Sequence, residues 1–391
     1  MHFTLKPAKQ PGGEDGEKGT FRSKRATVTK REKVMKRRTL CGVVCLLAAT
    51  LMGISSAWAA KKVDTDPKQI LPKPDAKPAD MTKPVKVFIL LGQSNMVGMG
   101  KIAGGEGSLE NAVKAKNKYP YLVDEAGNWT ERKDVRNVRV MSGKGGMQLF
   151  NNEWMNITGT KTIGVEFAVG HCLGNAIDAP VMILKSCIGN RCLGWDLLPP
   201  GSEPYEFGGE MNMGYRGTKE NPKGNGEKPG VLYAGWEYDI DVENAKKVLA
   251  DLGKYYPGAT KYEVAGFFFW QGEKDCGNAT WAQRYELNLV NFIKALRKDF
   301  DAPNAKFVLA TLGEATKGSG GNGGKVLEAQ FAVDGNSGKY PEFKGNVATV
   351  YSNPLSHGGS GNSHYGGNAE TYMDVGEAMG WAMAELLKPV K

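Results

Sequence analysis

The chain has 391 residues and a formal net charge of +9, and hydrophobic residues make up 41% of it. Residues 1–59 hold 12 of the basic and 4 of the acidic side chains, which leaves the rest of the chain at only +1. Because the excess charge is confined to the N-terminal segment, the basic balance does not indicate nucleic-acid binding, and no nucleic-acid partner is expected.

The N-terminal segment is predicted to be an export signal. A basic cluster at 36–38 precedes an apolar stretch over 40–54, and Ala57-Trp58-Ala59 offers a small-residue cleavage site. The apolar stretch is short for a membrane span, so no stable span is expected after cleavage. An uncleaved signal anchor is the alternative, and either Met1 or Met35 is the true start. Cleavage predicts a secreted, periplasmic or cell-surface protein.

Composition divides the chain into a leader and signal peptide over 1–59, a linker over 60–84 and one folded domain over 85–391. The linker is rich in proline and lysine and is expected to be an extended tether. No internal repeat or second linker follows it.

The folded domain is predicted to alternate strands and helices. Apolar, partly β-branched runs predict buried strands, and helical spacing of apolar residues predicts the helices between them. Strands are expected at 87–91, 181–184, 264–270, 307–312 and 346–351, and helices at 164–175, 238–256, 281–299 and 368–387. This alternation predicts an α/β fold, a three-layer α/β/α sandwich around a mainly parallel sheet of about five strands. The polar segment 101–160 is expected to be a long loop that is either functional or decorated with small strands, and 193–235 is also expected to be loop-like.

Four cysteines follow the leader, an even number that is compatible with disulfides in an exported protein: Cys172, Cys187, Cys192 and Cys276. Cys187 and Cys192 are close enough in sequence to clip a loop. The spacing is not a zinc pattern and only three histidines follow the leader, so neither a metal nor a cofactor is expected.

Three predicted strands end in polar, glycine-containing segments, at 92–95, 189–190 and 271–273. In a parallel sheet these ends lie on one edge, where α/β proteins bind ligands. Ser94 is either a nucleophile on a tight strand-to-helix turn or an ordinary serine at a helix start. Its context, G-x-S-x-M, does not fit the G-x-S-x-G elbow of α/β-hydrolases.

A serine nucleophile needs a base and an oxyanion hole. His364, just before the last helix, is preferred as the base over His357, whereas His171 lies in a helical, apolar stretch and is assigned a structural role. The candidate oxyanion donors are the backbone N–H groups of Ser94 and Gly189 and the side-chain amide of Gln271. Gly189 taken by itself is also explained as an ordinary turn glycine, and Gln271 as an ordinary polar loop residue.

Three motifs carry a family resemblance: G-Q-S-N-M at 92–96, W-Q-G-E-x-D at 270–275 and H-Y-G-G-N-A-E-T-Y at 364–372. Their order and spacing resemble the SGNH/GDSL hydrolase superfamily, in particular its sialate O-acetylesterase-like, carbohydrate esterase family 6 branch, over roughly 85–387. The resemblance implies Ser94 as nucleophile and His364 as base. It also implies an oxyanion hole made by Ser94, Gly189 and Gln271.

The chain departs from that superfamily at one position. Many members carry an aspartate three residues before the histidine, where this chain has Gly361. The acid that orients His364 must then come from elsewhere, and Glu273 is the choice that the resemblance implies. Asp275, or a dyad in which a backbone carbonyl orients His364, stays open.

The resemblance implies an exported serine esterase that removes O-acetyl groups from carbohydrate, such as acetylated xylan or a sialoglycan. Aromatic residues on the loops could form sugar platforms or could pack those loops: Trp195, Tyr205, Tyr215 and Trp236. A non-catalytic carbohydrate-binding or cell-surface module with the same fold is the alternative. A lipase or thioesterase is disfavoured because no apolar lid-like stretch occurs. The glycan, the acetyl position and the oligomeric state are not determined by the sequence.

Overall fold

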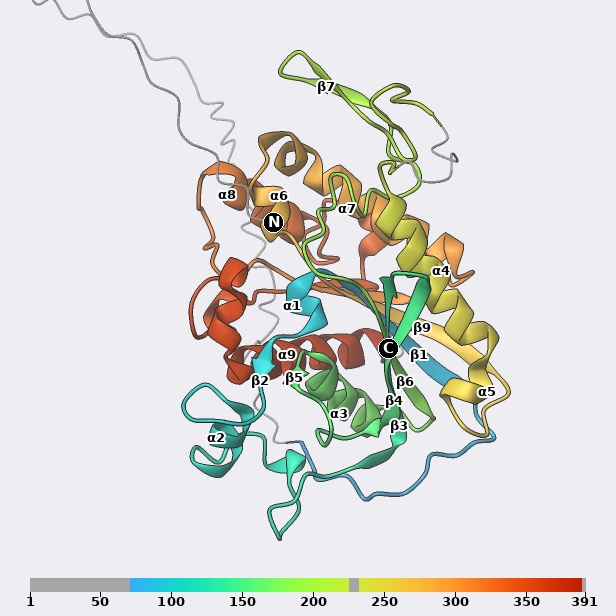
Figure 1. Cartoon of the computed structure of the whole chain (residues 1–391), viewed down its shortest axis with the longest axis vertical. Helices are drawn as coiled ribbons and strands as arrows, with labels where there is room; N and C mark the ends of the chain where they lie inside the picture. The colour runs from blue at the N-terminus through green and yellow to red at the C-terminus, as the bar shows by residue number, and fades with distance from the viewer. Residues whose placement is uncertain (1–70, 225–231, 389–391) are drawn as a thin grey trace, which may run out of the picture. The chain divides into compact units, whose positions relative to one another are not determined.

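The computed structural model describes residues 71–224 and 232–388 (Figure 1). The predicted signal peptide over 1–59 and the first part of the predicted linker lie outside the described residues. Residues 71–84 form no helix or strand, but Leu71 is only 3% exposed and packs into the hydrophobic core. The end of the predicted tether therefore packs against the domain.

The centre of the domain is a sheet that has seven strands among the described residues, in the order β11-β10-β9-β1-β6-β3-β4 (Figure 1). In that order their bounds are Val347–Val350, Lys306–Ala310, Tyr262–Trp270, Val85–Gly92, Val181–Ser186, Arg132–Gly143 and Gly146–Met155. All neighbouring strands are parallel except β3 and β4, which form an antiparallel pair at one edge. The predicted α/β fold with a mainly parallel sheet is confirmed.

The five predicted strands are all present, and the sheet gains two more from the segment 101–160 that was expected to be a loop. β3 alternates apolar and charged residues, with Val138 and Val140 buried and Arg139 between them half-buried. β4 is mostly exposed or half-buried because it lies at the edge of the sheet. Charged and polar residues therefore mask the strand pattern in both strands; in β4 they lie at the exposed edge, whereas in β3 several are buried, among them Arg136 and Asn137.

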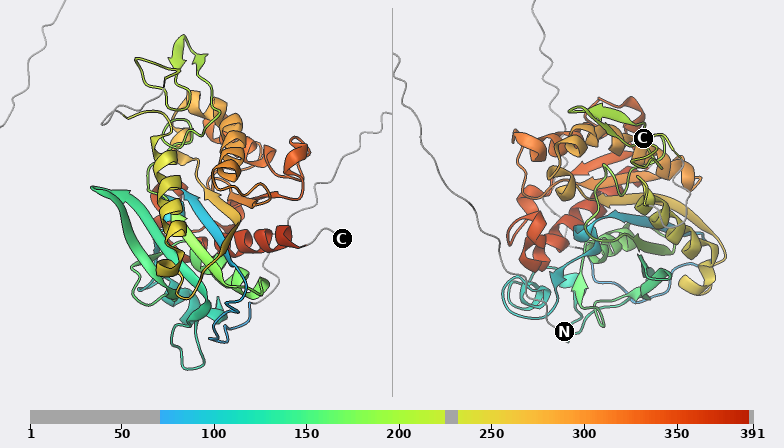
Figure 2. Two further views of the ribbon diagram at one scale, coloured as in Figure 1. Left: turned by 90° about the vertical axis from the view of Figure 1, so that its right-hand side faces the viewer. Right: turned by 45° about the horizontal axis from the view of Figure 1, so that its top comes forward.

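Helices cover both faces of the sheet, which makes the predicted three layers (Figure 2). One face packs against α4 (Trp236–Ala250), α5 (Leu252–Tyr255), α7 (Ala279–Asp299) and α8 (Gly321–Ala332). The other face packs against α2 (Leu109–Lys114), α3 (Glu166–Ala176) and α9 (Ala369–Leu387). Successive side chains of β1 serve the two cores in turn, because strand side chains alternate between faces: Val87 and Ile89 join the first, Phe88 and Leu90 the second.

The remaining elements are short. They are α1 (Ser94–Val97), β2 (Gly100–Lys101), η1 (Pro120–Leu122), β5 (Thr162–Ile163), β7 (Tyr205–Phe207), β8 (Glu210–Asn212), α6 (Glu273–Cys276), η2 (Pro341–Phe343), η3 (Asn353–Leu355) and η4 (Gly361–Gly367). The helix predicted over 238–256 is interrupted at Asp251. α8 was not predicted, because its first turn is rich in glycine, the weakest helix former after proline.

The cysteines at 172, 187, 192 and 276 are all free, so the loop-clipping disulfide considered for Cys187 and Cys192 is not formed. Cys192 instead lies with its Sγ atom 3.2 Å from Asp196 Oδ2. Among the residues that the structure describes, no helix is long and apolar enough to cross a membrane. The same residues contain no cluster of three or more His, Cys, Asp or Glu side chains suited to hold a metal ion.

Candidate active site

The nucleophile candidate lies where β1 ends at the carboxyl edge of the sheet. Gly92 has a φ of 147°, and a Cβ atom there would lie 2.3 Å from the carbonyl oxygen of Trp270 on β9. Glycine is therefore required for the chain to turn this close to the neighbouring strand. Ser94 follows as the first residue of α1, where a backbone N–H has no partner within the helix.

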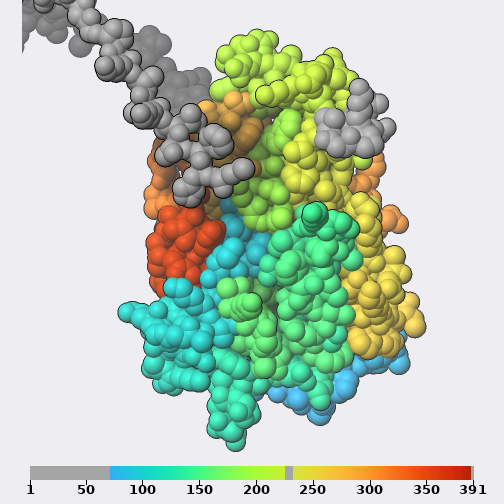
Figure 3. All heavy atoms as spheres, viewed as in Figure 1, coloured from blue at the N-terminus to red at the C-terminus, as the bar shows by residue number. Residues whose placement is uncertain are grey.

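A pocket of about 440 Å³ opens over this turn. It is lined by Gln93, Ser94, Met99, Gly189, Asn190, Lys274, Gly361, Asn362 and His364. These residues come from four separate parts of the chain: the segment after β1, the segment after β6, α6 and η4. In the space-filling view the segment that follows β1 (cyan) lies beside the segment that precedes α9 (red) on the same face (Figure 3).

Gly189 lies directly against the nucleophile candidate. A Cβ atom built on Gly189 would be 3.4 Å from Ser94 Cβ, so the backbone of the segment after β6 is in van der Waals range of the serine. The two backbone N–H groups expected to form the oxyanion hole therefore lie in neighbouring, contacting segments.

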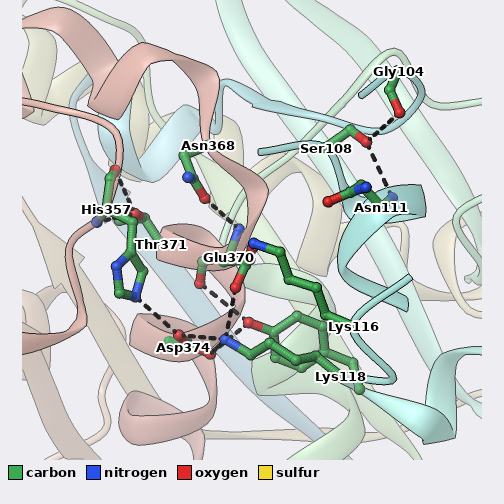
Figure 4. A network of polar contacts seen from close by, with 11 residues as sticks. Gly104, Ser108, Asn111, Lys116, Lys118, His357, Asn368, Glu370, Thr371 and Asp374 are labelled. Carbon is green, nitrogen blue, oxygen red and sulfur yellow. Dashed lines mark hydrogen bonds and ion pairs between the residues drawn. The ribbon is translucent and has the colours of Figure 1, made fainter. Parts of the chain in front are cut away.

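The described residues contain three histidines, and His364 is the one that lines the pocket with Ser94. It has a left-handed φ of 54° within η4. His357 lies in a second pocket of about 570 Å³, with its Nε2 atom 3.5 Å from Asp374 Oδ2, next to Lys118 and Glu370 (Figure 4). His171 is buried in α3, where burial, followed by the charge of Arg132, pushes its pKa well below the ordinary value, as its predicted structural role requires.

Asn95, the residue after Ser94, connects the nucleophile turn to the histidine turn. Its Nδ2 group donates to Glu273 Oε1 at 2.6 Å and to the carbonyl oxygen of Gly361 at 3.1 Å. The Tyr372 hydroxyl lies 3.2 Å from Asn95 Oδ1 and 3.4 Å from the carbonyl oxygen of His364. Both ends of the histidine turn are thus tied to Asn95, one directly and one through Tyr372.

The roles of Asn95 and Tyr372 were missed in the sequence, although both residues lie inside the motifs at 92–96 and 364–372. A motif marks such positions, but it does not say which of its polar side chains point at each other. That information comes with the packing of η4 and α9 against α1.

Glu273 is buried beneath the pocket and does not line it. Its Oε2 atom accepts from Gln93 Nε2 at 2.5 Å, and its Oε1 atom accepts from Asn95. Burial, followed by the charge of Glu314, raises the pKa of Glu273 to about 7. The carboxylate thus contacts the residues on either side of Ser94, and its connection to His364 runs through Asn95 and Tyr372.

Gln271 does not reach the pocket, which corrects the expectation that its amide is an oxyanion donor. It is fully buried, and its Nε2 group donates to Asp275 Oδ2 at 2.6 Å and to the carbonyl oxygen of Arg191 at 2.9 Å. Both amide hydrogens are therefore engaged within the protein, and none is left for a ligand.

Asp275 and Lys274 hold the loop that carries Gly189. The carboxylate of Asp275 accepts from the N–H groups of Leu193 and Gly194 at 2.9 and 2.8 Å, and burial raises its pKa to about 6. Lys274 Nζ donates to the carbonyl oxygen of Asn190 at 2.9 Å and pairs with Asp196 at 2.8 Å. The W-Q-G-E-x-D segment therefore clamps the loop after β6 on one side and the nucleophile turn on the other.

A buried ion pair supports α1 from below. Lys185 Nζ lies 2.6 Å from Glu166 Oε2 and donates to the carbonyl oxygen of Val97 at 2.9 Å. Burial lowers the pKa of Lys185, and the carboxylate of Glu166 opposes that change. The last carbonyl of α1 thus has a charged donor fixed in the core.

The four aromatic residues proposed as sugar platforms do not line the pocket: Trp195, Tyr205, Tyr215 and Trp236. The Tyr205 hydroxyl donates to the carbonyl oxygen of Thr280, and the Tyr215 hydroxyl to Asp239. The guanidinium of Arg191 lies 4.9 Å from the Trp236 ring centre. These contacts pack the long loop against the domain.

Comparison with known proteins finds a family match over the C-terminal part of the chain. Residues 235–385 match the family described as carbohydrate esterase, sialic acid-specific acetylesterase. This match contains the W-Q-G-E-x-D segment and His364, whereas Ser94 and Gly189 precede it. No protein with a curated description matches the sequence.

Three solved structures were found to be similar. A protein from Arabidopsis thaliana is 17% identical over 77% of this chain and 98% of its own, with a TM-score of 0.44. A carbohydrate acetylesterase from Xanthomonas citri is 14% identical over 76% of this chain and 55% of its own, with a TM-score of 0.46. NanS is 15% identical over 72% of this chain and 78% of its own, with a TM-score of 0.36. The family resemblance predicted from the motifs is confirmed over residues 235–385, which match the carbohydrate esterases of the sialic acid-specific acetylesterase family.

Proposed function

We propose that the protein is an exported serine esterase that removes O-acetyl groups from carbohydrate. The observation that carries this proposal is that Ser94, Gly189 and His364, from three distant parts of the chain, line one pocket. A hydroxyl, a backbone donor and an imidazole around one cavity are the parts that acyl transfer requires.

In the proposed reaction His364 takes the proton of the Ser94 hydroxyl as Oγ attacks the acetyl carbonyl carbon. The oxyanion of the tetrahedral intermediate accepts hydrogen bonds from the N–H groups of Ser94 and Gly189. His364 then donates its proton to the sugar oxygen, the ester bond breaks, and an acetyl-serine remains. Water, deprotonated by His364, attacks this ester and releases acetate, which restores the free enzyme.

Glu273 is proposed to support this reaction from beneath the pocket. The resemblance implies that it orients His364, and its hydrogen bonds suggest the route, through Asn95 and Tyr372 rather than by direct contact. Asp275 is the less suitable candidate, because both its oxygens accept from the loop after β6 and from Gln271.

A carbohydrate substrate is supported by the family match over 235–385. Acetylated polysaccharide such as xylan, and sialoglycans, are the substrate classes that we propose.

The direct test is acetate release from p-nitrophenyl acetate and acetylated xylan by the purified protein and by Ser94→Ala. We expect Ser94→Ala to lose kcat by a factor on the order of 10⁶, as removal of the nucleophile does in a serine hydrolase. Ser337→Ala, at an exposed serine, is the matched control and should keep full activity. Undiminished acetate release by Ser94→Ala would exclude Ser94 as the nucleophile.

The non-catalytic alternative is tested with a serine-directed phosphonate. An esterase should be labelled at Ser94, and the label should be absent from Ser94→Ala. Glycan binding by the wild-type protein without labelling or acetate release would instead support a carbohydrate-binding module that keeps the fold.

Export is tested separately by sequencing the N-terminus of the protein recovered from the periplasm or the medium. Cleavage after Ala59 would give a chain that begins at Ala60. A full-length chain retained in the membrane fraction would support the uncleaved anchor instead.

A further inference from the structure

Glu314 is a carboxylate that the sequence did not single out, and it reaches the histidine turn from an independent loop. It lies between β10 and α8, and its Oε2 atom accepts the backbone N–H of Gly361 at 3.0 Å. Gly361 is the first residue of η4, three positions before His364, and both residues line the pocket with Ser94. Glu314 therefore holds one end of the turn that carries the proposed base.

Two carboxylates converge on the backbone of Gly361. A Cβ atom built there would lie 2.6 Å from Glu314 Oε2 and 2.7 Å from Glu273 Oε1, both too close for any real side chain. The carbonyl oxygen of Gly361 accepts from Asn95 at 3.1 Å, so both polar groups of this peptide residue are engaged. Glycine at 361 thus admits two carboxylates from other parts of the chain to the space beside it.

Of these two carboxylates, Glu273 has each oxygen hydrogen-bonded to an amide beside Ser94 and is only 3% exposed. Glu314 is exposed and contacts the histidine turn itself. The two charges are close enough that Glu314 helps to raise the pKa of Glu273, after burial. Glu273 is therefore hydrogen-bonded to the nucleophile turn, and Glu314 is hydrogen-bonded to the histidine turn.

We propose that Glu314 is a positioning residue for His364: its carboxylate fixes the Gly361 end of η4 and so holds the turn that carries the imidazole beside Ser94. A general base acts only when its ring is held within hydrogen-bond reach of the proton that it takes, so a group that fixes its turn affects the rate. This inference rests on the proposed function, because it takes His364 to be the catalytic base.

The other titratable groups near Glu314 and His364 come from α6, η4 and α9. They are Glu273, Lys274, Cys276, Tyr365 and Tyr372. Burial raises the pKa values of both tyrosines and of Cys276 well above neutrality, so these three stay uncharged near pH 7. Lys274 is held by Asn190 and Asp196, so it keeps its place when Glu314 is changed.

The test uses the full chain and two readouts. The first is the split between kcat and KM with p-nitrophenyl acetate in Glu314→Ala, which removes the acceptor of the Gly361 N–H. We expect kcat to fall about tenfold with KM little changed, because a misplaced base slows the reaction without weakening substrate binding. Glu314→Gln keeps an acceptor oxygen at this position and should recover most of the rate.

The second readout is the amide hydrogen exchange of the Gly361 N–H, which reports whether the turn is still held. We expect this exchange to be faster in Glu314→Ala than in the wild type, because the N–H group loses its acceptor. Glu328→Gln, at an exposed glutamate of α8, is the matched control and should change neither readout.

The inference is overturned if Glu314→Ala has the kcat and KM of the wild type and of Glu328→Gln, or if Glu314→Gln recovers none of the rate. The failure of the proposed function would look different: the wild-type protein would release no acetate and take no phosphonate label. In that case unchanged exchange at Gly361 in Glu314→Ala would still overturn the role of Glu314 in holding the turn.

Discussion

The side chain of Asn95 donates to the backbone carbonyl of Gly361 at 3.1 Å, and this bond joins the nucleophile turn to the histidine turn. The two residues are 266 positions apart in the chain. The relative placement of Ser94 and His364 therefore depends on a side chain that belongs to neither group of the proposed reaction.

Replacing Asn95 with alanine should uncouple the two turns. Asn95→Ala leaves Glu273 and the carbonyl of Gly361 each without one buried donor, which should lower the free energy of unfolding by about 3 kcal/mol. We expect kcat to fall at least tenfold, because the base is no longer fixed over the serine. Urea unfolding and steady-state kinetics measure the two effects.

Tyr372→Phe tests the second connection between the two turns. It removes one hydroxyl that bridges Asn95 and His364 and leaves the bonds to Glu273 and Gly361 in place. A smaller loss of stability, about 1 kcal/mol, is expected. Equal kinetics in Asn95→Ala and the wild type would show that the two turns are positioned independently.

The buried carboxyl of Glu273 should make stability depend on pH. Burial, followed by the charge of Glu314, raises its pKa from the ordinary 4.5 to about 7, so the folded protein binds this proton more tightly than the unfolded chain does. Its contribution to stability is therefore complete below pH 4.5 and is lost as the pH rises to about 7. Glu273→Gln cannot ionise, so its free energy of unfolding should rise relative to that of the wild type across this pH window, by up to roughly 3 kcal/mol.

Urea unfolding at several pH values measures this gain. Asp275 and Glu377 have raised pKa values in the same window, but they are present in both proteins and so cancel in the comparison. The free energy of unfolding of Glu328→Gln should depend on pH as that of the wild type does. The same pH dependence in Glu273→Gln would contradict the assignment of the raised pKa to Glu273. The same variant should lose most of its activity, because an amide at 273 presents an N–H group to the Asn95 donor.

Lys274 is expected to control the oxyanion loop. Lys274→Met removes the donor to the carbonyl oxygen of Asn190, the residue after Gly189, and leaves Asp196 without its lysine partner. We expect kcat to fall about tenfold, since one misplaced oxyanion donor costs up to 10²–10³ in rate. Lys274→Arg should recover part of the loss. Kinetics as in the wild type, matched by the control Lys325→Met, would show that the loop keeps its position without this lysine.

Gly361 should not tolerate a side chain. In Gly361→Ala the new methyl group would lie 2.6 Å from Glu314 and 2.7 Å from Glu273, so at least one carboxylate must move. We expect a loss of activity of tenfold or more, together with a lower melting temperature. Gly105→Ala is the control, because nothing lies within 4 Å of a Cβ atom there. The double variant Glu314→Ala/Gly361→Ala tests which carboxylate the new methyl group displaces. If the double variant is no more active than Gly361→Ala alone, Glu314 is not the displaced group.

Much of the fold followed from local patterns. Long apolar runs such as 264–270 predicted central strands, because a strand covered by helices on both faces needs apolar residues at every position. β3 and β4 escaped notice because charged and polar residues interrupt their apolar runs: several of those in β3 are buried, whereas β4 lies at the sheet edge and is largely exposed or half-buried. α8 escaped because its glycine-rich start hides the helix that packing against α7 stabilises.

The sequence by itself determined which residue types are available for chemistry and where the strands that carry them end: Ser94, Gly189 and His364 were identified from spacing, strand ends and motifs. The tertiary structure alone decided which polar side chains face the pocket and which face each other. It turned Gln271 inward to Asp275 and Arg191, placed Glu273 under the nucleophile turn and brought Glu314 to Gly361. The reason is physical: spacing along a chain fixes the element on which a side chain lies, whereas its hydrogen-bond partner depends on how separate segments pack, such as those of Glu273 and Gln93, which are 180 residues apart.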